Sequence, residues 1–171
     1  MFGEIVKFTL PALITFLTAF FMIRLMLKRE EENRKIDAIL KNQKMITPIR
    51  LQAYERLVLF LERISPNHLI MRVQQPGMKV QELQRQLLAN IRTEFEHNLS
   101  QQVYISHSTW EIIRNAKEQT IKLINSCADS ISPDANCMLL TKEIFDKLIE
   151  LEKAPNQVAI DKLKDDISTL F

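Results

Sequence analysis

A long apolar run near the amino terminus dominates the hydropathy pattern of the chain. Phe8–Ile23 carries no charged side chain, and the apolar stretch extends over Ile5–Leu27, with Lys7 and Arg24 near its ends. A helix over this stretch is about 34 Å long at about 1.5 Å per residue, enough to cross a hydrocarbon core of about 30 Å. The pattern therefore predicts a transmembrane anchor over residues 1–28.

The composition of the run favours lipid over the other surroundings of an apolar segment. A secretory signal peptide is typically followed by a cleavage site of small residues, and no such site follows this run. A buried core helix is the remaining alternative, but a cylinder that is apolar all round is more typical of a membrane span. The side chains predicted to contact lipid are Phe8, Leu10, Pro11, Leu13, Ile14, Phe16, Leu17, Phe20, Phe21 and Ile23.

Basic residues just after the run predict its orientation. Cytoplasmic flanks of a span carry an excess of Lys and Arg, and here the excess follows the span. The amino terminus is therefore expected outside, and everything after about residue 28 in the cytoplasm. The orienting charges are Arg24, Lys28, Arg29, Arg34 and Lys35.

Beyond the run, apolar residues recur at three- and four-residue steps, which predicts amphipathic helices. These are expected over 49–64, 78–100 and 109–129, followed by two further helices. The first of these two opens at Ser132-Pro133 and the last at Ala154-Pro155-Asn156; Ser108 and Glu111 form a predicted capping box for 109–129. Residues 29–47 are interpreted as a juxtamembrane helix or linker that ends at Thr47-Pro48.

Composition agrees with a helical fold. The chain has only two glycines, too few for the turns and phosphate-binding loops of β-rich or Rossmann-type folds. Short connections between amphipathic helices favour an antiparallel bundle. The predicted fold is all-α, with an N-terminal single transmembrane helix followed by a cytoplasmic antiparallel helical bundle over residues 48–171.

Charge and cysteine content narrow the function classes. Residues 24–92 carry 14 Lys or Arg against 7 Asp or Glu, which suits an anionic cytoplasmic leaflet or simply reflects basic helix faces. No clustered Arg face with interleaved aromatic residues is present, so a nucleic-acid partner is not expected. Cys127 and Cys137 do not form a C-x-x-C pair, and they are expected to be free thiols in a reducing compartment.

Two weak signals for self-association lie in the first fifty residues. Thr15 and Ala19 form a small-xxx-small pair of the kind found between packed membrane helices. Ile36, Ile39 and Leu40 begin an apolar stripe that is too short to establish a coiled coil. Together these residues are a possible oligomer face.

One spacing suggests metal chemistry, and weakly. Glu94 and His97 are three residues apart, as in the Glu-x-x-His motif of di-iron helical bundles. Such a site needs a second motif, and neither His68 nor His107 is preceded by a glutamate at that distance. Nucleophile, phosphate-loop and zinc-protease motifs are also lacking. No catalytic residue, cofactor or metal is therefore predicted, with Glu94 and His97 kept as weak candidates.

The segment RLQAYERLVLFLERISPNHLIMRV, Arg50–Val73, adds a resemblance. With the amino-terminal run and the charged segment after it, it resembles an uncharacterised family of small single-span membrane proteins of Bacteroidota-type bacteria. The resemblance implies a location in the bacterial inner membrane. It brings no activity and no site residues.

These patterns lead to three functional hypotheses. The first is a membrane-tethered helical bundle that acts without catalysis as an interaction or scaffold subunit of an envelope complex, with the lipid bilayer and a protein at the inner membrane as partners. The second is a homo-oligomeric structural membrane protein. The third, and weakest, is a metal-dependent helical-bundle enzyme that uses Glu94 and His97.

Overall fold

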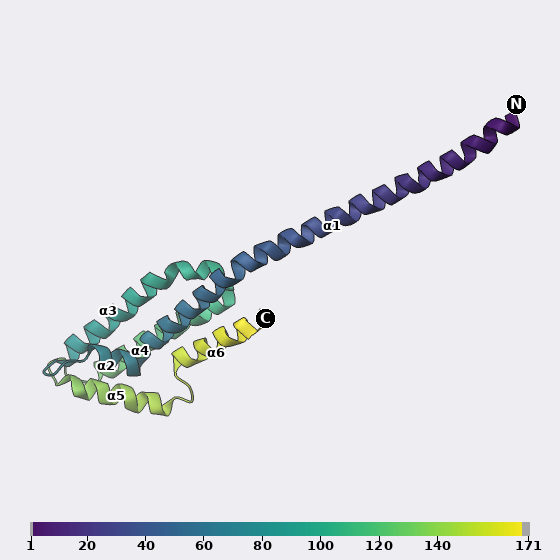
Figure 1. Ribbon diagram of the computed structural model, residues 1–171. Helices are drawn as coiled ribbons and strands as arrows, with labels where there is room; N and C mark the ends of the chain where they lie inside the picture. Colours follow the sequence, from purple (N-terminus) through teal and green to yellow (C-terminus); the bar gives the residue numbers. More distant parts are fainter. Residues whose placement is uncertain (1, 169–171) are drawn as a thin grey trace. The chain divides into compact units, whose positions relative to one another are not determined.

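The described chain is helical almost throughout (Figure 1). The computed structural model describes residues 2–168, with side chains from residue 13 onward. Within that range there is no strand, although an isolated antiparallel bridge joins Lys79 and Asn136. The chain divides into two compact units, Met1–Thr47 and Pro48–Phe171. The all-helical class predicted from the sequence is confirmed.

The described residues contain six α-helices and one 3₁₀ helix. Their bounds are α1 Phe2–Arg63, α2 Pro66–Val73, α3 Val80–Asn98, η1 Leu99–Tyr104, α4 His107–Asp129, α5 Cys137–Glu150 and α6 Pro155–Ser168.

The prediction of a transmembrane anchor over residues 1–28 is wrong. No helix within the described part of the chain is both long enough and apolar enough to cross a bilayer. The uncharged run Phe8–Ile23 corresponds to about 24 Å of helix at about 1.5 Å per residue, which is shorter than a hydrocarbon core of about 30 Å. Lys7 and Arg24 stand at its two ends, so a longer window includes charged side chains.

The predicted location in the inner membrane is wrong for the same reason. A single-pass inner-membrane topology, with the amino terminus outside and a cytoplasmic bundle, has no described helix to support it. The side chains of Phe8, Leu10 and Pro11 lie outside the described residues. The other predicted anchor residues are exposed on α1, and they are Leu13, Ile14, Phe16, Leu17, Phe20, Phe21 and Ile23.

The basic residues that were expected to orient the span lie exposed along α1. Arg34 donates a hydrogen bond of 2.7 Å to the carboxylate of Glu30, one turn earlier. Exposed pairs at this spacing contribute about 0.3–0.5 kcal/mol to helix stability. Arg24, Lys28, Arg29 and Lys35 belong to the same charged stretch of the helix, and without a span they define no topology.

Thr47-Pro48 does not end the helix, contrary to the sequence-based expectation. Proline inside a helix removes one backbone donor and costs about 3 kcal/mol or more. The turns that follow are deeply buried: Leu57, Phe60 and Leu61 expose at most 1% of their surface. Full burial of one such side chain contributes roughly 1.5–3 kcal/mol, which holds the turns after Pro48 helical as far as Arg63.

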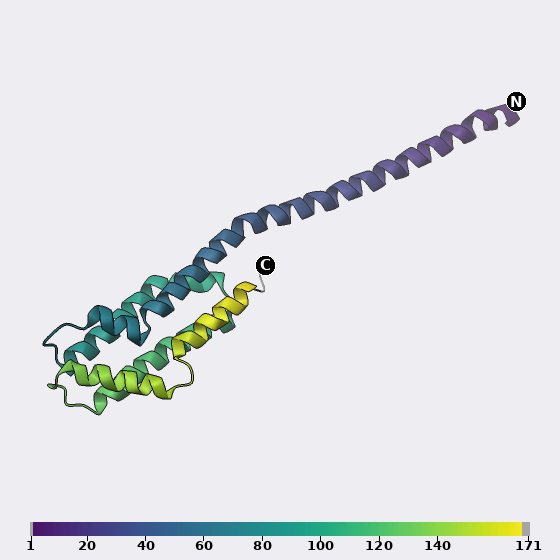
Figure 2. The ribbon, with the colours of Figure 1, turned by 60° about the horizontal axis from the view of Figure 1, so that its bottom comes forward.

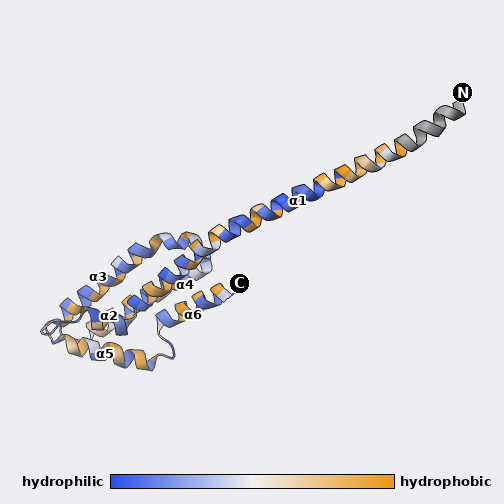
Figure 3. Ribbon diagram, viewed as in Figure 1, coloured by the Kyte–Doolittle hydropathy of each residue, from blue (hydrophilic) through white to orange (hydrophobic). Residues whose placement is uncertain are grey.

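The second unit is an antiparallel helical bundle around one apolar core. Side chains from the last turns of α1 and from α2 to α6 join this core. Figures 1 and 2 show α3 running back along the end of α1, and α4 and α6 running in opposite directions beside each other. In Figure 3 the bundle helices alternate between apolar and polar positions, whereas the described start of α1 is apolar almost without interruption.

Two helices begin at positions that differ from the local sequence signals. The N-cap of α4 is Ser106, whose hydroxyl oxygen accepts from the backbone N–H of Thr109, and not Ser108. α5 begins at Cys137 behind the cap Asn136, and not at Ser132-Pro133. The preceding loop is held by backbone bonds from Val80 and Gln81 to the carbonyls of Ala135 and Pro133, at 3.0 and 3.1 Å. These tertiary bonds keep Pro133 out of the helix.

A buried polar contact ties α4 to α6. Thr109, which is fully buried, donates its hydroxyl proton to a carboxylate oxygen of Asp166, and Lys162 Nζ lies 2.7 Å from the other oxygen. Burial by itself raises the pKa of Asp166, but the hydrogen bonds from Lys162 and Thr109 outweigh it, so the pKa lies below its usual value.

The Asp166 contact predicts a pH dependence of folding stability. A carboxyl group whose pKa is lowered by folding contributes stability above its unfolded pKa of about 3.9, and this contribution is lost as the pH falls through the folded value. Asp166→Asn should therefore reduce the difference in unfolding free energy between pH 6 and pH 3, measured by urea denaturation. Exposed Asp146→Asn is the control. An unchanged difference in Asp166→Asn would contradict the assignment.

Candidate functional site

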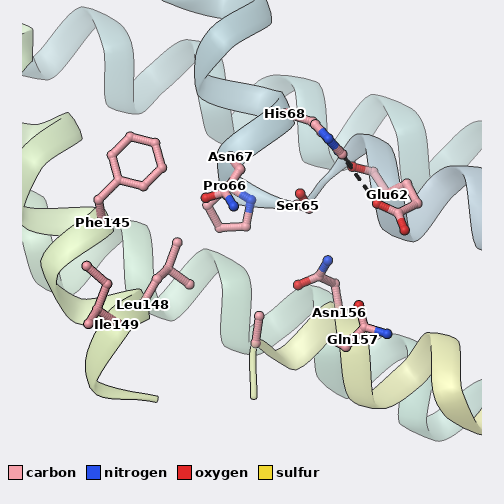
Figure 4. A pocket seen from close by; sticks show the side chains of 11 residues that line it. Glu62, Ser65, Pro66, Asn67, His68, Phe145, Leu148, Ile149, Asn156 and Gln157 are labelled. Atoms are coloured by element: carbon pink, nitrogen blue, oxygen red, sulfur yellow. Dashed lines mark hydrogen bonds and ion pairs between the residues drawn. The ribbon is translucent and has the colours of Figure 1, made fainter. Parts of the chain in front are cut away.

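A cleft of about 420 Å³ lies in the second unit where four helix ends meet (Figure 4). The end of α1, the start of α2, the end of α5 and the start of α6 surround it. Its volume is within the range of small-molecule and peptide side-chain pockets. The residues that line it are Glu62, Ser65, Pro66, Asn67, His68, Phe145, Leu148, Ile149, Ala154, Asn156 and Gln157.

Two prolines place these helix ends. The residue before a proline is pushed out of the α region, and Ser65 is accordingly extended between α1 and α2. Pro66 and Pro155 each stand at the first position of a helix, where the missing N–H has no intrahelical partner to lose. The chain therefore turns sharply at both places, and the cleft forms between the two turns.

The mouth of the cleft is polar. His68 Nδ1 lies 3.2 Å from the carbonyl oxygen of Glu62 and 3.6 Å from its carboxylate. Gln157 Nε2 donates to Asp161 Oδ1 at 2.9 Å. The hydrogen bonds from Gln157 and Lys153 hold the pKa of Asp161 below its usual range. The amide donor of Gln157 is thus engaged by the protein itself.

Asn156 is the unusual residue of the cleft. Only 6% of it is exposed, and among the described residues its Oδ1 atom is buried without a hydrogen-bond partner. Buried polar atoms are paired in the great majority of cases, and an unpaired one costs about 1–3 kcal/mol. In Figure 4 its side chain points from α6 toward the space between Pro66 and Leu148. The cleft therefore contains an acceptor that no described group of the chain satisfies.

The weak candidates for metal ligands, Glu94 and His97, do not line the cleft, and Glu94 pairs with arginine side chains instead. Glu94 pairs with Arg63 at 3.3 Å and with Arg72 at 3.6 Å, and only 14% of its side chain is exposed. His97 is exposed. Among the described residues, no group of three or more His, Cys, Asp or Glu side chains could hold a metal ion. The structure thus brings Glu94 to two guanidinium groups and not to a set of metal ligands.

The possible oligomer face lies on α1 in the first unit. Thr15 and Ala19 are exposed there, and Ile36, Ile39 and Leu40 expose between 49% and 58% of their surface. The apolar stripe is thus exposed on the described helix. Nothing in the structure tests whether a second chain covers it, and self-association stays a prediction.

The remaining chemically distinctive side chains belong to the core. Cys127 and Cys137 are free and buried, and burial raises the pKa of the Cys127 thiol. Trp110 stacks on Phe95 with ring centroids 5.5 Å apart, and Lys117 Nζ lies 4.2 Å from the centroid of the Phe95 ring. These contacts make Trp110 and Phe95 packing residues between α3 and α4.

Comparison with known proteins places the chain in a family. Residues 1–170 match the sequence model of DUF7935, a family of unknown function. The chain belongs to this family. No curated protein and no solved structure matches it. The family match carries no statement about source, so the resemblance to Bacteroidota-type proteins stays a prediction.

Sequence reasoning did not find Asn156 as a site residue. The only local signal was Pro155-Asn156 at the start of a helix, where an asparagine ordinarily serves to cap backbone N–H groups. That the Asn156 acceptor remains unpaired is a property of the assembled bundle. A local pattern cannot reveal it.

Burial of both thiols predicts low reactivity in the folded state. Reaction requires the exposed thiolate, and the raised pKa of Cys127 further lowers its thiolate fraction. At pH 8, a chromogenic disulfide reagent should modify Cys127 and Cys137 far more slowly in the native protein than in 6 M urea. Reaction of either cysteine at the rate of free cysteine without urea would contradict the burial.

Proposed function

We propose that the protein is a non-catalytic interaction subunit that binds a partner protein through the apolar surface of α1 in its first unit. The observation that carries the proposal is the continuous exposure of large apolar side chains from Leu13 to Leu27. The most exposed of the large side chains there are Met22 at 75%, Met26 at 73% and Phe16 at 68%.

The size of this surface supports a binding role. An aromatic side chain presents roughly 150–250 Å², so the half-exposed or more exposed rings of Phe16, Phe20 and Phe21 alone contribute on the order of 300 Å². With the neighbouring Leu, Ile and Met side chains, the surface exceeds the few hundred Å² that monomeric proteins usually expose in one patch. Covering 300 Å² is worth about 7 kcal/mol before the costs of association.

The state of the reactive groups favours binding over catalysis. The carboxylate of Glu94 is engaged by Arg63 and Arg72, and the two cysteines are buried. Catalysis requires groups that can reach a substrate with suitable geometry and protonation. The reactive groups singled out in the sequence do not combine into such an arrangement, and an interaction role accounts for the apolar surface directly.

Self-assembly is a second candidate function, favoured by the exposed stripe of Ile36, Ile39 and Leu40. This stripe lies farther along α1, beyond the charged residues 28–35, and its members recur at helical spacing. Symmetric association of identical chains is the commonest form of oligomer. In this case the partner is another copy of the chain.

The proposal predicts that polar substitutions in α1 abolish partner binding. Tagged protein is purified from its native host, and its mass is then measured by light scattering. The double variant Phe16→Gln/Phe20→Gln should lose a stoichiometric partner that the wild type retains. The matched control is Met71→Gln/Val103→Gln, which changes two apolar residues of the bundle that are still more exposed, at 81% and 78% against 68% and 50% for Phe16 and Phe20.

The outcomes separate the candidates. A second polypeptide lost only from the Phe16/Phe20 variant supports the partner proposal. A multiple of the chain mass with no second polypeptide favours self-assembly instead. Purification of the tagged chain as a monomer without a second polypeptide contradicts both the partner proposal and self-assembly. Flotation of the chain with phosphatidylcholine vesicles in the absence of any protein partner also contradicts both.

A further inference from the structure

The cleft at the start of α6 has the chemistry of a recognition site for a hydrogen-bond donor. Asn156 Oδ1 is buried and unpaired among the described residues, and the side chain points into the cleft (Figure 4). The amide donor at the mouth, Gln157 Nε2, is already bound to Asp161. One N–H of the Gln157 amide is thus engaged, whereas the acceptor Asn156 Oδ1 has no partner among the described residues.

Asn156 has no structural task at the helix start that would account for this acceptor. An asparagine at the N-cap accepts from the first free backbone N–H groups of a helix, but α6 begins at Pro155, so Asn156 is its second residue and not the cap. In α6 the N–H groups of Gln157 and Val158 instead donate to the carbonyl oxygen of Ala154, at 3.0 and 3.3 Å. The side chain is thus buried at a cost without serving as a cap.

The walls beside Asn156 are apolar. Pro66 is buried, Phe145 and Leu148 are half-buried, and Ile149 stands at the rim with 82% of its surface exposed. A ligand that fits must combine an apolar group with an adjacent N–H donor. A peptide has this combination at every apolar residue, since its backbone N–H stands next to the side chain.

We propose that the cleft binds one apolar residue of a partner peptide, and that the Asn156 side chain turns toward it so that Oδ1, which exposes less than 1 Å² in the free protein, accepts a hydrogen bond from the peptide's backbone N–H. The apolar side chain packs against Phe145, Leu148 and Ile149, while Glu62 and His68 flank the entrance. The inference rests on the proposed interaction function, but it concerns a different surface from α1 of the first unit. It assigns the partner a short apolar segment with a free backbone donor.

The test uses the full chain, labelled with ¹⁵N, and three small probes. N-acetyl-leucine methylamide provides the apolar group and N–H donors, its fully N-methylated analogue lacks the donors, and leucinamide adds a free ammonium group. The first probe should produce saturable shifts in the Asn156 side-chain amide and in the backbone signals of Leu148 and Gln157. The methylated analogue should bind at least about tenfold more weakly, since it leaves the acceptor unpaired.

Variants at Asn156 distinguish a role of this residue in ligand binding from a role in folding stability. Asn156→Leu should abolish probe binding and raise the melting temperature by a few degrees, because a buried unpaired acceptor is replaced by an apolar group. Asn156→Ala should also lose binding, and it serves if the leucine variant does not fold. Asn115→Ala, at an exposed asparagine of α4 that does not line the cleft, should bind as the wild type does.

Several results would overturn the inference. Recognition of a backbone N–H would be excluded if the methylated analogue bound with equal affinity or if Asn156→Ala bound the probe unchanged. It would also be excluded if leucinamide bound and N-acetyl-leucine methylamide did not. A lower melting temperature in Asn156→Leu would assign Asn156 to structure. The Phe16→Gln/Phe20→Gln variant should bind the probe normally, so failure at the cleft is distinguishable from failure of partner capture through α1.

Discussion

Burial of one helical stripe at the end of α1 is the constraint on which the bundle depends. Tyr54, Leu57, Phe60, Leu61 and Ile64 are almost completely inaccessible and contact the apolar faces of the later helices. Since each contributes on the order of 1.5–3 kcal/mol through burial, the stripe holds the last turns of α1 in the bundle. Ser65-Pro66 prevents the helix from continuing, so α1 ends at Arg63 and the turn into α2 forms one side of the cleft.

The bundle helices could be predicted because their signal is local and periodic. Leu83, Leu87 and Ile91 recur at helical spacing and are all buried in α3. Two errors concern prolines. Pro48 lies within a helix although a proline usually interrupts one, and Pro133 lies outside a helix because backbone bonds across the bundle hold its loop. The apolar run of the first unit predicted a span that the described helix does not provide.

The candidate site was less accessible to sequence reasoning than the fold. Glu94 and His97 stood out by their spacing, but spacing does not reveal that Arg63 and Arg72, from α1 and α2, lie against the carboxylate. Asn156 carried only the signal of a helix start. Its significance depends on which N–H groups are already bonded and which atoms water reaches, and both are set by packing between segments that are distant along the chain.

The bridge between Lys79 and Asn136 has a consequence for how the bundle can come apart. Lys79 also bonds to Asp134, 55 positions away, so the two loops close a large ring of chain that contains α3 and α4. Closing such a ring carries an entropy cost that grows only slowly with the length of the chain in the ring. Several backbone hydrogen bonds between the two loops offset this cost when they form together. α5 can therefore leave the bundle only when these bonds break as a set. We therefore expect opening at this end to be cooperative rather than gradual, because the hydrogen bonds of the Val80, Gln81 and Cys137 amides join the same two loops.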